Sequence, residues 1–187
     1  MLIRKGLILE GLSDFPAVIV ADDDAVIRSL LRSKLESIDQ IVFLASNGVE
    51  AVDLASRMQP KLILLDLKMP RLDGLRACQR IRQMPHNAKT PIVILTAIIG
   101  KDPEAAARRV GATAFLDKPF RSAHLLRALA GFLDISEETR AVINQAADRA
   151  AGVVRTTSAS KVTTPETQAK ENSLLDRGKG ILTVLRN

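Results

Sequence analysis

The sequence predicts an α/β protein with a parallel sheet, and two features of the chain indicate this fold. Five short apolar runs rich in Val, Ile and Leu recur along residues 16–134, and none alternates apolar with polar residues. Such runs are typical of strands that are covered on both faces. Segments with helical spacing separate the runs. Repeated strand–helix pairs imply right-handed crossovers, with helices on both faces of the sheet.

The expected elements follow in order along the chain. The expected strands are AVIVA (17–21), IVFLA (41–45), LILLD (62–66), PIVILTA (91–97) and ATAFL (112–116). The expected helices are the segments 25–38, 48–58, 75–84, 103–111 and 122–133. Asp24 suits the N-cap of the first helix, and Asp73 suits a cap or turn. Gly111 at the end of the fourth helix is typical of a C-cap.

The chain changes in composition beyond Leu133. Segment 135–154 carries a weak, Ala-rich apolar stripe, and Asp134 with Glu137 suits an N-cap pair, so we predict an extra helix there. Residues 155–187 are expected to form a flexible tail, because 155–173 are rich in Ser and Thr. Residues 1–15 are expected to be an N-terminal extension without the apolar core of a signal peptide.

Composition excludes several classes of function. Aromatic residues make up 3% of the chain, with no Trp or Tyr, which argues against a stacking surface for single-stranded nucleic acid. Cys78 is the single cysteine, so no intramolecular disulfide forms and a reducing compartment such as the cytoplasm is expected. No segment approaches the ~20 apolar residues of a membrane span. The net charge of +6 is spread thinly, which favours a solvated basic surface over a nucleic-acid patch.

Polar residues follow four of the expected strands. Ligands bind outside the carboxyl ends of the strands in an open parallel sheet. Asp22–Asp24 follow the first strand, Asp66 ends the third, Thr96 ends the fourth, and Lys118–Pro119 follow the fifth. We expect these groups to converge on one edge of the sheet.

The residue types at this edge suit an aspartyl-phosphate site. Two unit charges ~4 Å apart repel by about 4 kcal/mol at an effective dielectric of 20, so the carboxylates need cations. Lys118 can neutralise one charge, and Mg²⁺ prefers one or two carboxylates with waters and phosphate oxygens. A phosphoryl group on Asp66 would give both cations further oxygen partners, and the Thr96 hydroxyl could donate to one of them.

Four pieces of the sequence together resemble the response regulator receiver domain, the phosphoacceptor half of a two-component system. The pieces are VIVADDDAVIR, LILLDLKMPRLDG, VILTA and AFLDKPF, in that order, over residues 16–134. The resemblance implies a doubly wound, five-stranded parallel sheet of order 2-1-3-4-5. It implies Mg²⁺-dependent phosphorylation of Asp66 by a partner histidine kinase or histidine phosphotransfer protein. The chain would then be a phosphoacceptor that catalyses its own phosphorylation and dephosphorylation, rather than an enzyme acting on other substrates.

The resemblance also implies roles for single residues. It gives Asp66 as the phosphoacceptor, and it gives Asp23, Asp66 and the Lys68 backbone carbonyl as Mg²⁺ ligands, with Asp22 acting indirectly. It gives Thr96 and Lys118 as contacts to the phosphate and Phe115 as the aromatic switch. It also implies a cis peptide bond before Pro119. The switch would act on the face formed by the fourth helix, fifth strand and fifth helix, where a downstream protein would bind.

Two other functions stay open at this point. DDDAV (22–26) fits the first motif of haloacid-dehalogenase-type phosphatases, which would make Asp22 the nucleophile. Such a phosphatase would also need an acidic pair after a strand that follows Lys118, and the sequence offers none there. The hypothesis also leaves the Asp66 segment unexplained. Alternatively, a receiver could regulate transcription through its C-terminal extension, for example as a homodimer. A separate DNA-binding domain is not expected, since the chain after Leu133 holds too little apolar sequence for a second core.

Overall fold

The apolar runs of the sequence form one six-stranded sheet in the order β2-β1-β3-β4-β5-β6. The computed structural model describes residues 17–97, 103–150 and 182–184. The strands are β1 (Ala17–Ala21), β2 (Ile41–Ala45), β3 (Leu62–Asp66), β4 (Ile92–Thr96), β5 (Ala114–Asp117) and β6 (Leu182–Val184). The first five strands pair in parallel, which confirms the predicted order 2-1-3-4-5.

The helices lie where the sequence predicts them, and most end a few residues earlier. They are α1 (Ala25–Glu36), α2 (Gly48–Arg57), α3 (Gly74–Arg82), α4 (Pro103–Arg109), α5 (Ser122–Leu129) and α6 (Glu137–Ala150), with a 3-10 turn η2 (Pro85–Asn87). The predicted ranges were too long because apolar residues such as Phe132 and Leu133 pack beside the core from the turn after the helix. No helix within the described parts of the chain has the length and apolar character needed to cross a membrane.

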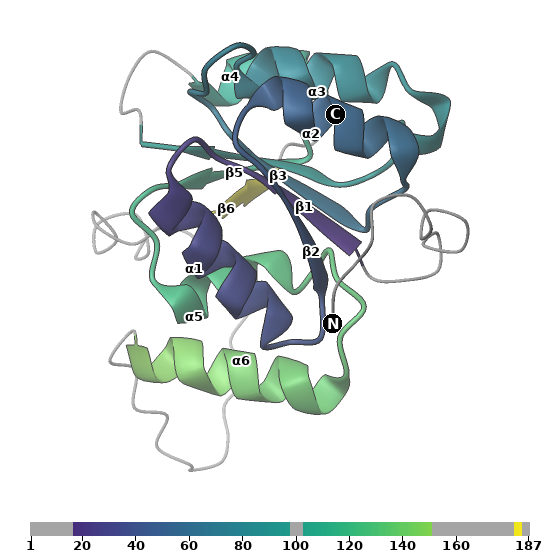
Figure 1. Ribbon diagram of the computed structural model, residues 1–187. Coiled ribbons are helices and arrows are strands. Elements are labelled where there is room, and N and C mark those ends of the chain that lie inside the picture. Colours follow the sequence, from purple (N-terminus) through teal and green to yellow (C-terminus); the bar gives the residue numbers. More distant parts are fainter. Residues whose placement is uncertain (1–16, 98–102, 151–181, 185–187) are drawn as a thin grey trace, which may run out of the picture.

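Two apolar cores, one on each face of the sheet, explain why the strands show no polar alternation. Ile19 and Ala21 of β1 pack with residues of α2, α3 and α4, whereas Val18 and Val20 pack with residues of α1, α5 and α6. Figure 1 shows these two helical layers on opposite sides of the sheet. A strand buried on both faces needs apolar residues at every position, which is the pattern of the sequence.

Helix α6 adds to the core on the α1–α5 side. Ile143 belongs to the same buried cluster as Leu125 and Leu129 of α5, and Ala147 is fully buried. Figure 1 shows α6 beyond α1 and α5, on the outside of that layer. The predicted extra helix is thus present, and its apolar stripe is the part that packs.

The start of α6 differs from the prediction. The Ser136 hydroxyl accepts a hydrogen bond from the Thr139 amide at 3.1 Å, so the cap is Ser136 and not the predicted pair of Asp134 with Glu137. Asp134 lies 3.4 Å from the Lys61 ammonium instead. Ile135 packs against the core before the helix begins, which explains the later start.

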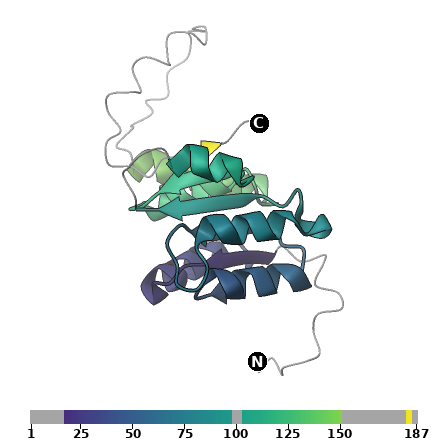
Figure 2. The ribbon, with the colours of Figure 1, turned by 90° about the horizontal axis from the view of Figure 1, so that it is seen from above.

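Strand β6 corrects the predicted tail. The sequence interpretation placed residues 155–187 in a flexible tail, but 182–184 pair with β5 in antiparallel orientation. Thr and Val favour strands, and the sheet edge at β5 gives them a partner. Figure 2 shows β6 at the end of the molecule away from the purple N-terminal elements. The rest of the predicted tail and residues 1–15 lie outside the described residues.

We predict that Ile143→Ala lowers the free energy of unfolding by about 2–5 kcal/mol, because it removes a core side chain and leaves a cavity. Val142→Ala is the matched control, since Val142 is 64% exposed while Ile143 is 4% exposed. The control should change stability by less than about 0.5 kcal/mol in urea unfolding. Equal effects of the two substitutions would show that α6 does not belong to the core.

Candidate functional site

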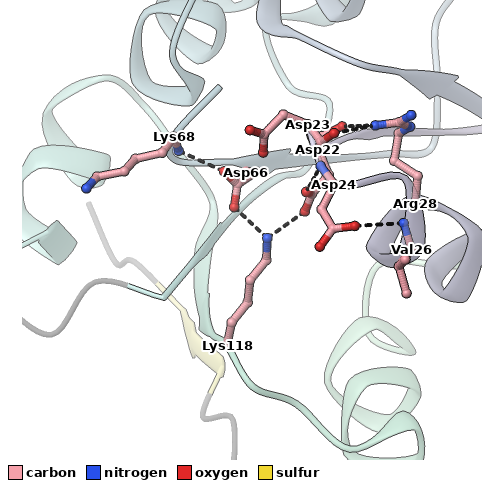
Figure 3. A network of polar contacts seen from close by, with 8 residues as sticks. All are labelled: Asp22, Asp23, Asp24, Val26, Arg28, Asp66, Lys68 and Lys118. Carbon is pink, nitrogen blue, oxygen red and sulfur yellow. Dashed lines mark hydrogen bonds and ion pairs between the residues drawn. The ribbon is translucent and has the colours of Figure 1, made fainter. Parts of the chain in front are cut away.

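Three elements bring two carboxylates and one ammonium together at the carboxyl edge of the sheet. Asp22 follows β1, Asp66 ends β3, and Lys118 follows β5. The Lys118 Nζ donates to Asp22 Oδ2 at 2.5 Å and to Asp66 Oδ1 at 2.6 Å. Figure 3 shows both carboxylates pointing toward this ammonium. The predicted convergence of these three residues is therefore present.

Backbone contacts hold the acidic loop after β1. The Asp24 amide donates to Asp22 Oδ1 at 3.0 Å, and the Asp24 carboxylate accepts from the Val26 amide at 2.7 Å, which confirms Asp24 as the N-cap of α1. The Arg28 guanidinium donates to the carbonyl oxygens of Asp22 and Asp23 at 2.7 and 3.0 Å (Figure 3). Asp22 is therefore fixed, while Asp23 is exposed to solvent.

Close backbone packing and one amide position Asp66. The Lys68 amide donates to Asp66 Oδ2 at 2.8 Å, so each carboxylate oxygen accepts one hydrogen bond. Gly74 begins α3 directly against this residue, and a Cβ there would lie 2.1 Å from the Asp66 carbonyl oxygen. Asp73 caps α3 by accepting from the Arg76 amide at 2.8 Å. The loop after β3 thus closes tightly around the base of the acid.

Burial and charge act in opposite directions on Asp66. Burial raises the pKa of the Asp66 carboxyl, and the nearby Asp22 carboxylate raises it further. The hydrogen bond from Lys118 and the charge of Lys118 lower it. Burial is the largest effect, so the pKa of Asp66 is raised overall. Burial lowers the pKa of Lys118, but its bonds to Asp22 and Asp66 outweigh burial and leave the pKa raised. The ammonium therefore stays protonated, and the acid pair depends on it for neutralisation.

Three further predicted residues lie next to this cluster. Thr96 is buried at the end of β4, and its carbonyl oxygen accepts from the Lys118 amide at 2.6 Å. The Lys118–Pro119 peptide bond is cis, as predicted. Phe115 of β5 is buried in the cluster on the α2–α4 side, with Ile94 and Ala107. The Phe115 side chain is therefore buried in this structure.

The donor set at this edge fits a hard divalent cation. The described residues contain no group of three His, Cys, Asp or Glu side chains placed to hold a metal ion. Mg²⁺ does not require such a group, because it commonly takes one or two carboxylates and keeps several waters. Asp23 and Asp66 supply carboxylate oxygens of this kind at the open side of the site.

Two contributors to the site were not identified from the sequence. Arg28 holds the acidic loop through backbone carbonyls, and Gly74 permits the close approach of α3 to Asp66. Arg28 is one polar residue on an amphipathic helix and carries no local signal. Gly74 was visible as the last residue of LILLDLKMPRLDG, and a glycine at the first position of a helix could have indicated close packing.

The fold and site define a parallel α/β protein with an acidic, lysine-bridged site at the strand ends. The family model of the response regulator receiver domain matches residues 18–130. The chain therefore belongs to the response regulator receiver family.

Two similar proteins are an uncharacterized protein and a named response regulator. The chain is 38% identical over 110 residues to an uncharacterized 14.6 kDa protein of Leptolyngbya boryana, covering 59% of this chain and 84% of that protein. It is 38% identical over 116 residues to the response regulator MprA of Mycobacterium sp. strain KMS, covering 62% of this chain and 50% of MprA. The chain thus spans about half the length of MprA.

Solved structures of receiver proteins share the fold. Chemotaxis protein CheY4 of Vibrio cholerae has a TM-score of 0.61 at 29% identity, covering 64% of this chain and 99% of CheY4. The receiver domain of the sensor histidine kinase PA1611 of Pseudomonas aeruginosa has a TM-score of 0.59 at 30% identity, covering 63% of this chain and 97% of that domain. The PA1611 domain was solved with a magnesium ion in its active-site cleft.

We predict that Lys118→Met raises the pKa of Asp66 further, because it removes the hydrogen bond and charge that oppose burial. At pH values above the ordinary pKa of an aspartate, Asp66 then keeps its proton in the folded state but has lost it in the unfolded state. Stability should therefore fall as pH rises through the pKa of folded Asp66. Carboxyl NMR titration measures this pKa. The control is Lys68→Met, since the Lys68 contact to Asp66 comes from the backbone amide. An unchanged Asp66 pKa in Lys118→Met would contradict the bridge.

We predict that Gly74→Ala destabilises the fold by about 1–3 kcal/mol or more, because the new methyl group would overlap a backbone oxygen that cannot move aside cheaply. Gly131→Ala is the control, since a Cβ at Gly131 meets nothing within 4 Å. Urea unfolding compares the two variants. A Gly74→Ala protein as stable as Gly131→Ala would show that α3 does not press on the Asp66 backbone.

Proposed function

We propose that the chain is a two-component response regulator whose Asp66 accepts a phosphoryl group from the phosphohistidine of a partner kinase or phosphotransfer protein. The observation that carries this proposal is the Lys118 ammonium, which bridges Asp66 and Asp22 at 2.6 and 2.5 Å. One lysine between two acids neutralises the site only partly. A divalent cation would supply further positive charge at the same edge and would offset the charge of an incoming phosphoryl group.

Asp66 is better placed than Asp22 to be the nucleophile. Both carboxylates accept one hydrogen bond on each oxygen, but the Asp22 side chain is 1% exposed whereas the Asp66 side chain is 10% exposed. In the proposed step an Asp66 oxygen forms a bond to phosphorus as the bond from phosphorus to the donor imidazole nitrogen breaks. The released imidazole nitrogen takes up a proton, and the product is an acyl phosphate.

The groups that would hold Mg²⁺ are Asp23, Asp66 and the Lys68 carbonyl, and Asp22 would act on the ion indirectly. When bound, the ion would neutralise charge on the phosphoryl oxygens. This chain supplies the rest of the site. Lys118 holds a proton at its Nζ and offers it as a hydrogen-bond donor, and the buried Thr96 lies at the adjacent strand end.

The proposed switch runs from Lys118 to β5. Phosphorylation would give the Lys118 ammonium a new oxygen partner in place of one carboxylate. The Lys118 amide donates a hydrogen bond to the Thr96 carbonyl oxygen. Phe115 lies three residues before Lys118, in β5. Repacking of Thr96 and Phe115 would then change the face of α4, β5 and α5, where we place the downstream protein.

Protein contact is the output that we favour. The 187 residues hold too little apolar sequence beyond α6 for a second core, so we place no DNA-binding domain within them. The haloacid-dehalogenase alternative gains no support, since the Asp22 side chain is 1% exposed and is less accessible to a phosphate donor than the Asp66 side chain at 10%.

We predict that incubation with Mg²⁺ and acetyl phosphate or phosphoramidate adds one phosphoryl group to the chain. Intact-mass spectrometry measures the gain, and chelation of Mg²⁺ should abolish it. Asp66→Asn should prevent labelling. Asp53→Asn is the matched control and should label like wild type, because the Asp53 carboxylate is exposed on α2 and pairs with Arg57 at 2.7 Å. Labelling of Asp66→Asn at the wild-type level would show that another residue accepts the phosphoryl group.

A further inference from the structure

The β5 edge of the sheet carries a strand from far along the chain. β5 is the last of the five parallel strands, and β6 pairs with its outer edge. The register is antiparallel, with Ala114 opposite Val184, Phe115 opposite Thr183 and Leu116 opposite Leu182. Without β6, the outer N–H and C=O groups of β5 would be open to pairing with another chain.

We propose that the outer edge of β5 is a strand-docking site, and that residues 182–184 are its intramolecular occupant. The docked segment closes the edge against a second extended strand. The binding mode is strand addition, in which backbone hydrogen bonds give the affinity and the alternating side chains give the specificity. The segment ILTVL (181–185) is the apolar, β-branched part of an otherwise polar tail, which suits this mode.

The length of the chain between α6 and β6 makes docking within one molecule favourable. α6 ends at Ala150 and β6 begins at Leu182, so 31 residues (151–181) connect them. A random coil of 31 residues has an average end-to-end distance of about 30 Å. Tethering of this kind gives an effective concentration on the order of 1 mM. The tail then keeps the edge closed only if the untethered segment binds with a Kd below about 1 mM.

The docked strand lies next to the proposed switch. Leu182 pairs with Leu116, two residues before Lys118, and Thr183 pairs with Phe115. Figures 1 and 2 show β6 at the β5 end of the sheet, where α4 and α5 flank it on opposite faces. If the proposed function holds, a partner that uses the edge of β5 must first displace residues 182–184. The tail is in that case a built-in competitor of the downstream protein.

The first test uses a synthetic peptide of residues 178–187 and two forms of unphosphorylated protein, without Mg²⁺. One form is the full chain and the other ends at Ile181, so that β6 is absent. We expect the peptide to bind the shortened form with a Kd below about 1 mM and to shift the NMR signals of Ala114–Leu116. The full chain should bind it at least about twofold more weakly, because its own tail competes at an effective concentration equal to or above the Kd. Equal binding to both forms, or no binding at millimolar peptide, overturns the proposal.

The second test examines the full chain through paired proline substitutions. Successive residues of a strand direct their N–H groups to opposite sides, so one of Leu182→Pro and Thr183→Pro removes a donor to β5 and the other does not. We expect the disruptive variant to speed amide exchange on the outer edge of β5 at least about fivefold, and its partner to have the smaller effect. Unchanged exchange in both variants overturns the proposal.

Sedimentation separates an intramolecular strand from an exchanged one. A monomer at the concentrations used supports docking within one chain. A dimer that dissociates when residues 182–187 are removed contradicts it, because the strand would then come from a second copy. None of these tests involves Asp66 chemistry, so their failure leaves the proposed phosphorylation intact. Failure of phosphorylation likewise leaves the docked strand intact.

Discussion

The site and the fold both depend on the Lys118 ammonium held between two carboxylates. Asp22, Asp66 and Lys118 come from three strands, and Lys118 is 96 residues from Asp22 and 52 from Asp66 in the chain. Loss of one member of a buried charge cluster leaves the others uncompensated, which costs far more than a surface pair. The bridge therefore connects the ends of β1, β3 and β5, and at Asp66 it opposes the burial that raises the pKa of this carboxyl.

The two-sided core makes this arrangement precise. Every residue of β1, β3 and β4 is buried, so these strands have no freedom to shift relative to one another. Asp66 is the last residue of its strand, and Asp22 and Lys118 lie one residue beyond theirs. The Arg28 side chain fixes the loop after β1 through backbone carbonyls, and close packing at Gly74 fixes the loop after β3. A rigid sheet with short, tied loops is a suitable support for a reaction that needs an acid, a cation and a lysine within hydrogen-bond distance.

Much of this could be predicted from the sequence, because the informative patterns are local. Apolar runs without alternation predict parallel, doubly covered strands, and strand-end polar residues predict the site at Asp22, Asp66 and Lys118. The start of α6 was missed because Ile135 packs before the helix begins, which no local capping pattern shows. The roles of Arg28 and Gly74 were missed because they depend on contacts with the backbone of other segments.

Strand β6 was missed for a similar reason. Its three residues are too few to stand out in a polar segment, and their pairing depends on the free edge of β5, which exists only once the sheet is built. In the described part of the chain, α6 and β6 lie outside the region that the receiver family model matches, and both lie against the β5–α5 side of the domain. That side is also where the proposed switch would act.

The central claim is that Asp66, and no neighbouring acid, receives the phosphoryl group. Treatment of the phosphorylated chain with borohydride reduces an acyl phosphate to an alcohol and converts that aspartate to homoserine, which peptide mass mapping locates. Homoserine at position 66 alone is the result that this account predicts. Homoserine at position 22 or 23, with Asp66 unmodified, would contradict it.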